Sequence, residues 1–560
     1  MLLSRTLVTR SASGAWRSYM EGATLTTPSP LWGGIQGGGL KRAKPSRRCY
    51  LLQQVLQGNR WGTPTLYPSP QGGGGHRRCA RCDYPAIGRH KTNSVLGVAT
   101  LLLLVTSTDA LAHASDRGYV LLLPIGHYIV GGAAAVAASF LALVFLPAGS
   151  LGRFAAARLA LIRLPSAARS YVSVVSFGIL LVLIAAGFFG SRDPLSNPLP
   201  LTIWTLLWVG LTLVQGLVGD IWQWINPWLG PYRLARSLGW PLHLLRYPER
   251  AGYWPALVLF AGFAWFELID IAPDEPGRLA SAVTVYTVFT LAMILVFGYR
   301  AWTRHGEFLS VFFGMIARFA VLQGRPSPDG SDEQLLLGVP GARVAAALPL
   351  PPSGVFFLLF ALASVSFDGL SRTFFWLGLI GVNPLEFPGR SAVIGVNSFG
   401  LLAAFLALAA VFFLAVSLGE RLTESRRPLE QAAGLYVWSI VPIALAYHLA
   451  HYLTVLLVNG QYGVVALSDP FSRGWNLFGT ADMAVGAGIV SGSAAAWVLW
   501  NTQAAAIIAG HVLAVLVAHV FAGRLHPKGR DAMLSQLPLT LLMIAYTVFG
   551  LWLLSTPTAG

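Results

Sequence analysis

Long apolar runs separated by short arginine-bearing segments dominate the chain from about residue 119 onwards. Each run is close to the roughly 20 residues that an α-helix needs to cross a hydrocarbon layer of about 30 Å. The runs lie near 119–146, 171–190, 200–218, 253–272, 278–299, 354–382, 397–418, 433–458, 500–523 and 537–555, and the sixth is interrupted. The pattern predicts an all-α, polytopic transmembrane bundle of about ten spans within residues 113–560.

Four other segments need a separate interpretation. Residues 221–245 carry Trp222, Trp224, Trp228 and Trp240 among arginines, which predicts a helix in the headgroup region, and 301–323 is expected to lie there too. Residues 325–352, with Pro, Gly and Ser, indicate a flexible loop. The small residues of 481–500 leave open whether that stretch forms a re-entrant or half helix.

The cations between the runs indicate an orientation. Loops on the cytoplasmic side carry the excess of Lys and Arg. With the amino terminus of residues 113–560 placed outside, 19 cations fall in cytoplasmic gaps and 6 in outer ones. This one-sided count supports both the outside amino terminus and the ten spans, and it predicts a multi-pass protein of a bacterial inner membrane.

The first 112 residues have a different character. Residues 1–88 are rich in Gly, Pro, Ser and Arg without an apolar period, so we expect a disordered or spurious leader. Residues 89–112 combine Arg89-His-Lys91, an apolar stretch and a small-residue end at Ala112, which is typical of a cleaved signal peptide. The true start of translation is therefore expected downstream of Met1.

The amino-acid composition indicates the surroundings of the protein and excludes one kind of partner. The chain is 55% hydrophobic and 11% charged, and its mean hydropathy is +0.61, which predicts the lipid bilayer as its surroundings. Much of the net charge of +16 lies in the first 112 residues, which hold 14 Lys and Arg against 3 acids. Because no basic stripe interleaved with aromatic residues follows, we expect no nucleic-acid partner.

Histidines inside the predicted spans are the strongest candidates for chemistry, because ionisable groups are costly in a bilayer. His448 and His451 are three residues apart, hence near one face of a helix. At 1.5 Å per residue, four histidines lie about 10–16 Å from the outer ends of their spans: His127, His448, His451 and His511. A buried histidine can instead hydrogen-bond a Ser, Tyr or carbonyl, and for His127 alone or for His519, which lies deeper, we favour that structural role.

Three acids come from the same predicted side, namely Glu267, Asp270 and Asp368, the last in the interruption of the sixth run. They are candidates for a catalytic base or bridging carboxylate, although Glu267 and Asp270 could equally form an interfacial network. Together with the histidines they predict a site for a divalent metal ion such as zinc, copper or iron, or, with two facing histidines, for haem b. The three cysteines all precede residue 90, so thiols play no part there.

His113 offers a separate copper ligand, because cleavage after Ala112 would place its imidazole beside a free amino terminus. The part of the chain after residue 112 contains no GxSxG, Walker, HExxH or strand-linked GxGxxG motif. Familiar hydrolase, ATPase, zincin and dinucleotide-binding classes therefore lack support.

Several segments resemble a bacterial family of multipass membrane proteins, most of them uncharacterised. They are His113–Pro124, Trp222–Trp228, His448–Gln461 and Asn501–His519. Some members carry the name fenitrothion hydrolase, a membrane-bound organophosphate hydrolase that acts with a smaller partner subunit. The resemblance covers about residues 113–555 and implies hydrolysis of a small-molecule phosphotriester, for which a metal-bound water is a sensible nucleophile. It supplies no catalytic motif to transfer.

Two other functions remain open at this point. The outer histidines would suit a transporter or chaperone of copper or another metal, and facing histidines would suit a haem-containing electron-transfer subunit. A structural scaffold is the alternative without chemistry. Metal content, a haem absorption band and histidine variants distinguish these possibilities.

Overall fold

The structure is a computed structural model, and it describes residues 125–143, 145, 151, 157–165, 167–327, 332–424 and 426–558. The chain divides into two units, Met1–His90 and Lys91–Gly560, and all described residues belong to the second. The predicted leader (1–88), the signal peptide (89–112) and His113 lie outside the described residues.

Ten helices of the described part are long and apolar enough to cross a membrane, which confirms the predicted polytopic bundle. Five precede the large loop: α3 (Ile125–Leu143), α5 (Ala168–Phe189), the continuous run α6–η1–α7 (Pro198–Leu217), α10 (Trp254–Leu268, after the 3-10 turn η2, Glu249–Ala251) and α11 (Pro276–Phe297). Five follow it: α15 (Pro352–Ser371), α17 (Arg390–Arg421), the run α18–η5–α19 (Leu429–Ser468), α20 (Ser493–Leu525) and α21 (Gly529–Ser555).

The third span contains a stretch of π-helix, which has more residues per turn than an α-helix. Its central part, η1 (Leu201–Leu211), is a π-helix between α6 (Pro198–Pro200) and α7 (Thr212–Leu217). Asn197 caps the start by accepting from the backbone N–H of Leu199 at 2.9 Å, and Pro198 and Pro200 occupy the first turn, where their missing N–H groups are tolerated. This span packs against α19 (Ile440–Ser468).

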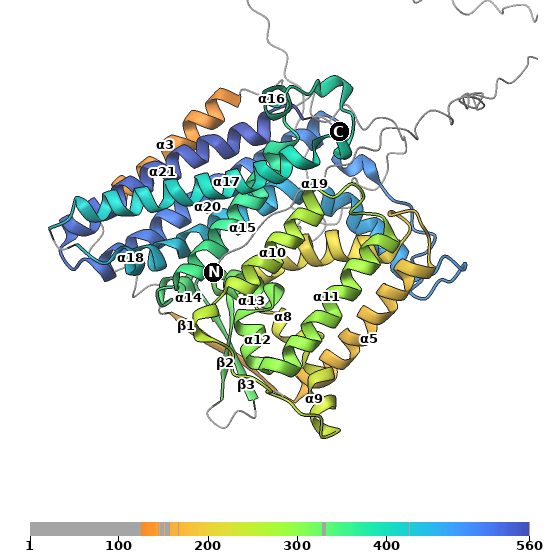
Figure 1. The fold of residues 1–560 in the computed structure, drawn as a ribbon. Helices are drawn as coiled ribbons and strands as arrows, with labels where there is room; N and C mark the ends of the chain where they lie inside the picture. Colours follow the sequence, from red (N-terminus) through yellow and green to blue (C-terminus); the bar gives the residue numbers. More distant parts are fainter. Residues whose placement is uncertain are drawn as a thin grey trace, which may run out of the picture. The chain divides into compact units, whose positions relative to one another are not determined.

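The helices that carry the largest core lie side by side. Figure 1 shows α3, α17, α20 and α21 together, and each of α3, α17 and α20 contacts α21. Helix α19 packs against α20, η1 and α15. Most of α15 is buried, from Ser353 to Asp368, so it is surrounded by protein for nearly its whole length.

The interruption of the sixth run lies later than predicted. Helix α15 continues to Ser371, and α16 (Phe374–Leu379) begins after Thr373, which caps it. Asp368 therefore lies in the last turns of α15 and not in a break. The 481–500 stretch is not a separate half helix, because the 3-10 turn η6 (Ala487–Val490) leads directly into α20. A further 3-10 turn, η4 (Pro384–Glu386), precedes α17.

A small antiparallel sheet was not predicted. It has the order β1–β3–β2, from β1 (Arg158–Pro165), β2 (Leu322–Pro326) and β3 (Asp332–Gly338). Strands β2 and β3, followed by α14 (Ala342–Ala345), occupy the segment expected to be a flexible loop, so that prediction was wrong. Arg169 forms an ion pair with Glu333 of β3, which links the sheet to the start of α5.

The segments predicted to lie in the headgroup region are only partly exposed. Helix α8 (Trp222–Ile225) buries Trp222, whose Nε1 donates to Ser310 at 3.0 Å, and Trp228 is also buried, whereas Trp240 is exposed. Helices α9 (Leu229–Ser237) and α12 (Tyr299–His305) both contact α11. In contrast, α13 (Phe308–Ile316), which leads into η3 (Ala317–Phe319), is almost wholly buried, so the interfacial prediction fails for it.

Loops predicted to share a side contact one another. The pairing of β1 with β3 and the Lys528–Glu424 ion pair join segments assigned to the cytoplasmic side. The Arg192–Glu275 ion pair joins segments assigned to the outer side. The ten spans make the protein a multi-pass membrane protein, and these three contacts each join segments that the charge pattern assigns to one side.

Candidate functional site

Four side chains from three helices form a buried polar cluster. The His451 Nε2 atom lies 2.8 Å from Oδ2 of Asp368, joining α19 to α15. The Tyr452 hydroxyl contacts the same Oδ2 at 2.7 Å and Oε1 of Glu267, on α10, at 3.1 Å. We call these residues, Glu267, Asp368, His451 and Tyr452, the polar cluster. In this cluster the carboxyl groups of Glu267 and Asp368 both accept from the Tyr452 hydroxyl.

The polar cluster is enclosed on the Asp368 side and open on the His451 side. Only 4% of the Asp368 side chain is exposed, against 31% for His451. When a neutral imidazole contacts an ionised carboxylate, which only accepts hydrogen bonds, the hydrogen of the contact sits on Nε2 and the lone pair on Nδ1. Asp368 thus fixes both the tautomer and the orientation of the ring.

A second layer of charges lies beyond the cluster. Arg372 Nη2 is 3.9 Å from Oδ1 of Asp368, one helical turn further along. Arg390 donates from Nη1 to the carbonyl oxygens of Glu267 at 2.9 Å and Asp270 at 3.1 Å, which caps the end of α10. These cations offset the negative charge of the buried acids.

Asp270 belongs to a different arrangement from Asp368. Its carboxylate receives two bonds from Arg278, from Nε at 2.8 Å and from Nη2 at 2.6 Å. Burial alone would raise the pKa of Asp270, but the Arg278 contacts and a bond from the Ala272 N–H outweigh burial and lower it. Asp270 therefore acts as half of a structural ion pair that joins α10 to α11.

His448 and His511 are more buried than His451, and each forms a hydrogen bond with a backbone carbonyl. The His448 Nε2 atom is 3.0 Å from the carbonyl oxygen of Trp208 in η1. The His511 Nδ1 atom is 2.8 Å from the carbonyl of Ile507, one turn earlier in α20, and its Nε2 has no partner among the described residues. Both imidazoles are thus directed at helix carbonyls, and each is almost wholly buried.

The remaining predicted residues are not part of the cluster. His127 is exposed on α3, and His519 contacts the Gln536 side chain at 3.1 Å. Within the described ranges, no group of three or more His, Cys, Asp or Glu side chains has an arrangement that could hold a metal ion. The zinc, copper or iron ion expected from the sequence therefore stays a prediction.

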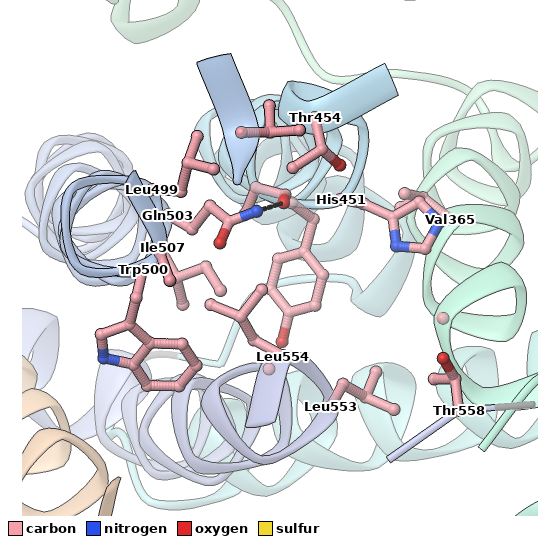
Figure 2. Close-up of a pocket in the computed structure, with 16 residues that line it drawn as sticks. Val365, His451, Thr454, Leu499, Trp500, Gln503, Ile507, Leu553, Leu554 and Thr558 are labelled. Atoms are coloured by element: carbon pink, nitrogen blue, oxygen red, sulfur yellow. Dashed lines mark hydrogen bonds between the residues drawn. The ribbon is translucent and has the colours of Figure 1, made fainter. Parts of the chain in front are cut away.

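A cavity of about 150 Å³ adjoins His451. Its walls are mostly apolar and include Val365, Leu499, Trp500, Ile507, Leu553 and Leu554. Figure 2 shows His451 at one edge and Gln503 across from it, with the Gln503 amide nitrogen bonded to the Ala450 carbonyl at 2.8 Å. Thr454 and Thr558 add hydroxyl groups to the wall.

The free nitrogen of His451 lies on the cavity side. A Cβ atom added at Gly369 would be 3.8 Å from His451 Nδ1, and both residues line the cavity. Glycine at this position leaves room beside the lone pair. An apolar chamber of this size is comparable to engineered protein cavities that bind benzene.

Sequence reasoning found His451, Asp368 and Glu267 but missed Tyr452, Gly369 and the cavity. Tyr452 directly follows His451, and its position one residue along the helix was the available signal. Gly369 follows Asp368 in the same way, but a cavity depends on how α15, α19, α20 and α21 pack together, which no single helix reveals.

No family model matches the chain, and neither the curated proteins nor the solved structures that were compared with it give a match.

Proposed function

We propose that this protein is a membrane-embedded hydrolase of small aryl esters, with aryl phosphotriesters as the substrate class that the family resemblance implies. The observation that carries the proposal is the position of His451. Its Nε2 is held by Asp368 at 2.8 Å, and the ring lines a mostly apolar cavity on the side of Nδ1.

His451 would act as a general base. An imidazole whose second nitrogen is oriented by a carboxylate is the common arrangement for taking a proton from a nucleophile, and a positioned base contributes about 10²- to 10⁴-fold to a rate. Asp368 would hold the neutral tautomer before the step and stabilise the imidazolium afterwards. Asp368 is therefore a positioning residue.

The cavity would receive the aryl group of the ester. Its volume of about 150 Å³ suits one aromatic ring and is too small for a whole triester, so the reacting phosphorus would lie at the edge, near His451. Apolar walls from Leu499, Trp500 and Ile507 favour such a ring over a charged phosphate ester.

The proposed reaction consumes one water. The water oxygen forms a bond to phosphorus while the bond between phosphorus and the aryl oxygen breaks. One water proton passes to Nδ1 of His451 and then to the aryloxide, so the products are a phosphodiester and a phenol. No external oxidant or reductant is needed.

The metal-dependent and haem-dependent alternatives stay separate predictions. The zinc, copper or iron ion expected for the histidines, copper handling, and haem b would each be recognised by metal analysis and an absorption spectrum of the purified protein. A smaller partner subunit is likewise a proposal from the family resemblance, to be tested by co-purification.

The test is the release of phenol from a chromogenic aryl phosphotriester by reconstituted protein. We expect His451→Gln to reduce kcat by about 10²- to 10⁴-fold. The matched control is His519→Gln, since His519 contacts Gln536 and lies outside the cavity lining. Hydrolysis by the wild type that persists in His451→Gln would overturn the assignment, and absence of hydrolysis of any aryl ester by the wild type would overturn the function.

A further inference from the structure

Exposed arginines lie beside exposed apolar side chains between residues 229 and 250. The arginines are Arg233, Arg236, Arg246 and Arg250, all exposed. The apolar side chains are Leu234, Leu238, Trp240, Leu244 and Leu245, which are 56–64% exposed. We call these nine residues the basic apolar patch. Its stretch of sequence contains a single acid, Glu249.

None of the four arginines forms an ion pair within the described part of the chain. This distinguishes them from Arg169, which pairs with Glu333 nearby. Four unpaired guanidinium groups on one segment create a positive surface that lacks an acidic partner from this chain.

Backbone contacts fix the depth of the patch. The His243 N–H donates to the Leu295 carbonyl at 3.1 Å, and the Leu245 N–H donates to the Val296 carbonyl at 2.9 Å. Leu295 and Val296 belong to the last turn of α11, a membrane span that ends at Phe297. Leu244 and Leu245 are therefore exposed at the level where a span leaves the hydrocarbon layer.

The patch is also tied to α9. The Tyr232 hydroxyl and His243 Nε2 are 2.8 Å apart, and α9 packs against α5 and α11, as Figure 1 shows. The segment is thus held against the ends of two spans, with its leucines and Trp240 turned away from the protein.

From this charge and this depth we infer that the basic apolar patch binds anionic phospholipids of the adjacent leaflet. The arginines would pair with the headgroup phosphates, since guanidinium groups match phosphate oxygens in geometry and charge. Trp240 and the leucines would enter the boundary between headgroups and acyl chains. The chemistry selects negatively charged over zwitterionic headgroups and is independent of the proposed hydrolysis.

The test is native mass spectrometry of the full chain titrated with phosphatidylglycerol or phosphatidylcholine of identical acyl chains. The wild type is expected to bind phosphatidylglycerol more tightly. The Arg233→Gln, Arg236→Gln variant should lose about fivefold in that affinity for each arginine removed, because one surface arginine contributes about 1 kcal/mol to anionic-lipid binding. Its affinity for phosphatidylcholine should not change.

The matched control is Arg421→Gln, Arg426→Gln, which removes two exposed arginines at the same predicted side of the bundle. It should keep the wild-type preference. A wild type that binds both lipids equally, or equal loss in the two double variants, would overturn the inference. Unchanged binding of the Arg233→Gln, Arg236→Gln variant together with tight binding of a soluble acidic protein would identify a protein surface instead. Circular dichroism of each variant shows that it remains folded.

Discussion

His451 on α19 and Asp368 on α15 face each other with 2.8 Å between Nε2 and Oδ2, at the edge of a cavity that both helices help to line. A buried acid in a membrane protein is costly unless paired. The imidazole and the Tyr452 hydroxyl meet that need, and the same pairing leaves Nδ1 of His451 free to take a proton.

Replacing Asp368 by Asn should remove the general-base function of His451 but keep a hydrogen bond between residue 368 and the imidazole. The Asn amide can donate to Nε2, which would move the imidazole hydrogen to Nδ1 and remove the lone pair from the cavity side. We expect kcat to fall by about 10²- to 10⁴-fold with a smaller change in KM. Phenol release under steady-state conditions measures both constants. Asp482→Asn, at an exposed position, is the control, and equal kcat values in the two variants would contradict the role of Asp368.

Tyr452→Phe should destabilise the bundle, because it removes the hydroxyl that contacts Asp368 and Glu267. A buried group that loses its hydrogen-bond partner costs about 1–3 kcal/mol. Unfolding in mixed micelles with increasing SDS measures the loss. Tyr462→Phe on the same helix is the control and should behave as the wild type. If both variants unfold alike, the hydroxyl does not hold the two acids.

Gly369→Ala should separate activity from stability. The new Cβ would lie 3.6 Å from Leu553 Cδ1 and 3.8 Å from His451 Nδ1, which is ordinary contact, so the helix should accept it and gain about 0.5–1 kcal/mol. The methyl group would fill space beside the lone pair, and we expect KM to rise and kcat to fall.

Gly262→Ala is the control for this change. Nothing lies within 4 Å of its added Cβ in α10, so it should gain stability and keep wild-type rates. Thermal unfolding and phenol release are measured on the same samples. Undiminished hydrolysis by Gly369→Ala would show that the reaction does not use this cavity.

Acid should weaken the Asp270–Arg278 ion pair. Arg278 lowers the folded-state pKa of Asp270 below its ordinary value of 3.8. The pair therefore stabilises the fold above pH 3.8, and this stability is lost as the pH falls through the lower folded-state pKa. The melting temperature of the wild type should exceed that of Asp270→Asn at pH 6, and the two should converge below pH 3.8. A gap that does not depend on pH would contradict this account.

The spans were predictable because about 20 apolar residues cross a bilayer only as a helix. All ten predicted runs correspond to helices, although the helix of the sixth run, predicted at 354–382, ends at Ser371. The pairing of β1 with the rest of the sheet was missed for a physical reason. Arg158 of β1 pairs with Gly338 of β3, and such a pairing across a long separation leaves no local period to detect. Helix α13 was predicted in the headgroup region because its sequence shows that it is apolar but does not show that other parts of the protein bury it.

The candidate site was predictable only in part. A spacing of three residues leaves two side chains about 60° apart around a helix, so His448 and His451 can share a face and still meet different neighbours. In the structure one contacts the Trp208 carbonyl of η1 and the other contacts Asp368 of α15. His127 and His511 were predicted at a similar depth in the membrane but are not part of the polar cluster. Depth along a span does not determine the rotation of a helix about its axis, and this rotation decides which neighbours a side chain meets.

The most direct test of the central claim is chemical rescue of a His451→Gly variant. The variant should release almost no phenol from an aryl phosphotriester, and added imidazole should restore the rate in a concentration-dependent way, because the free base can occupy the space beside Gly369. A His451→Gly variant that hydrolyses the ester at the wild-type rate without imidazole would contradict the claim that His451 is the base.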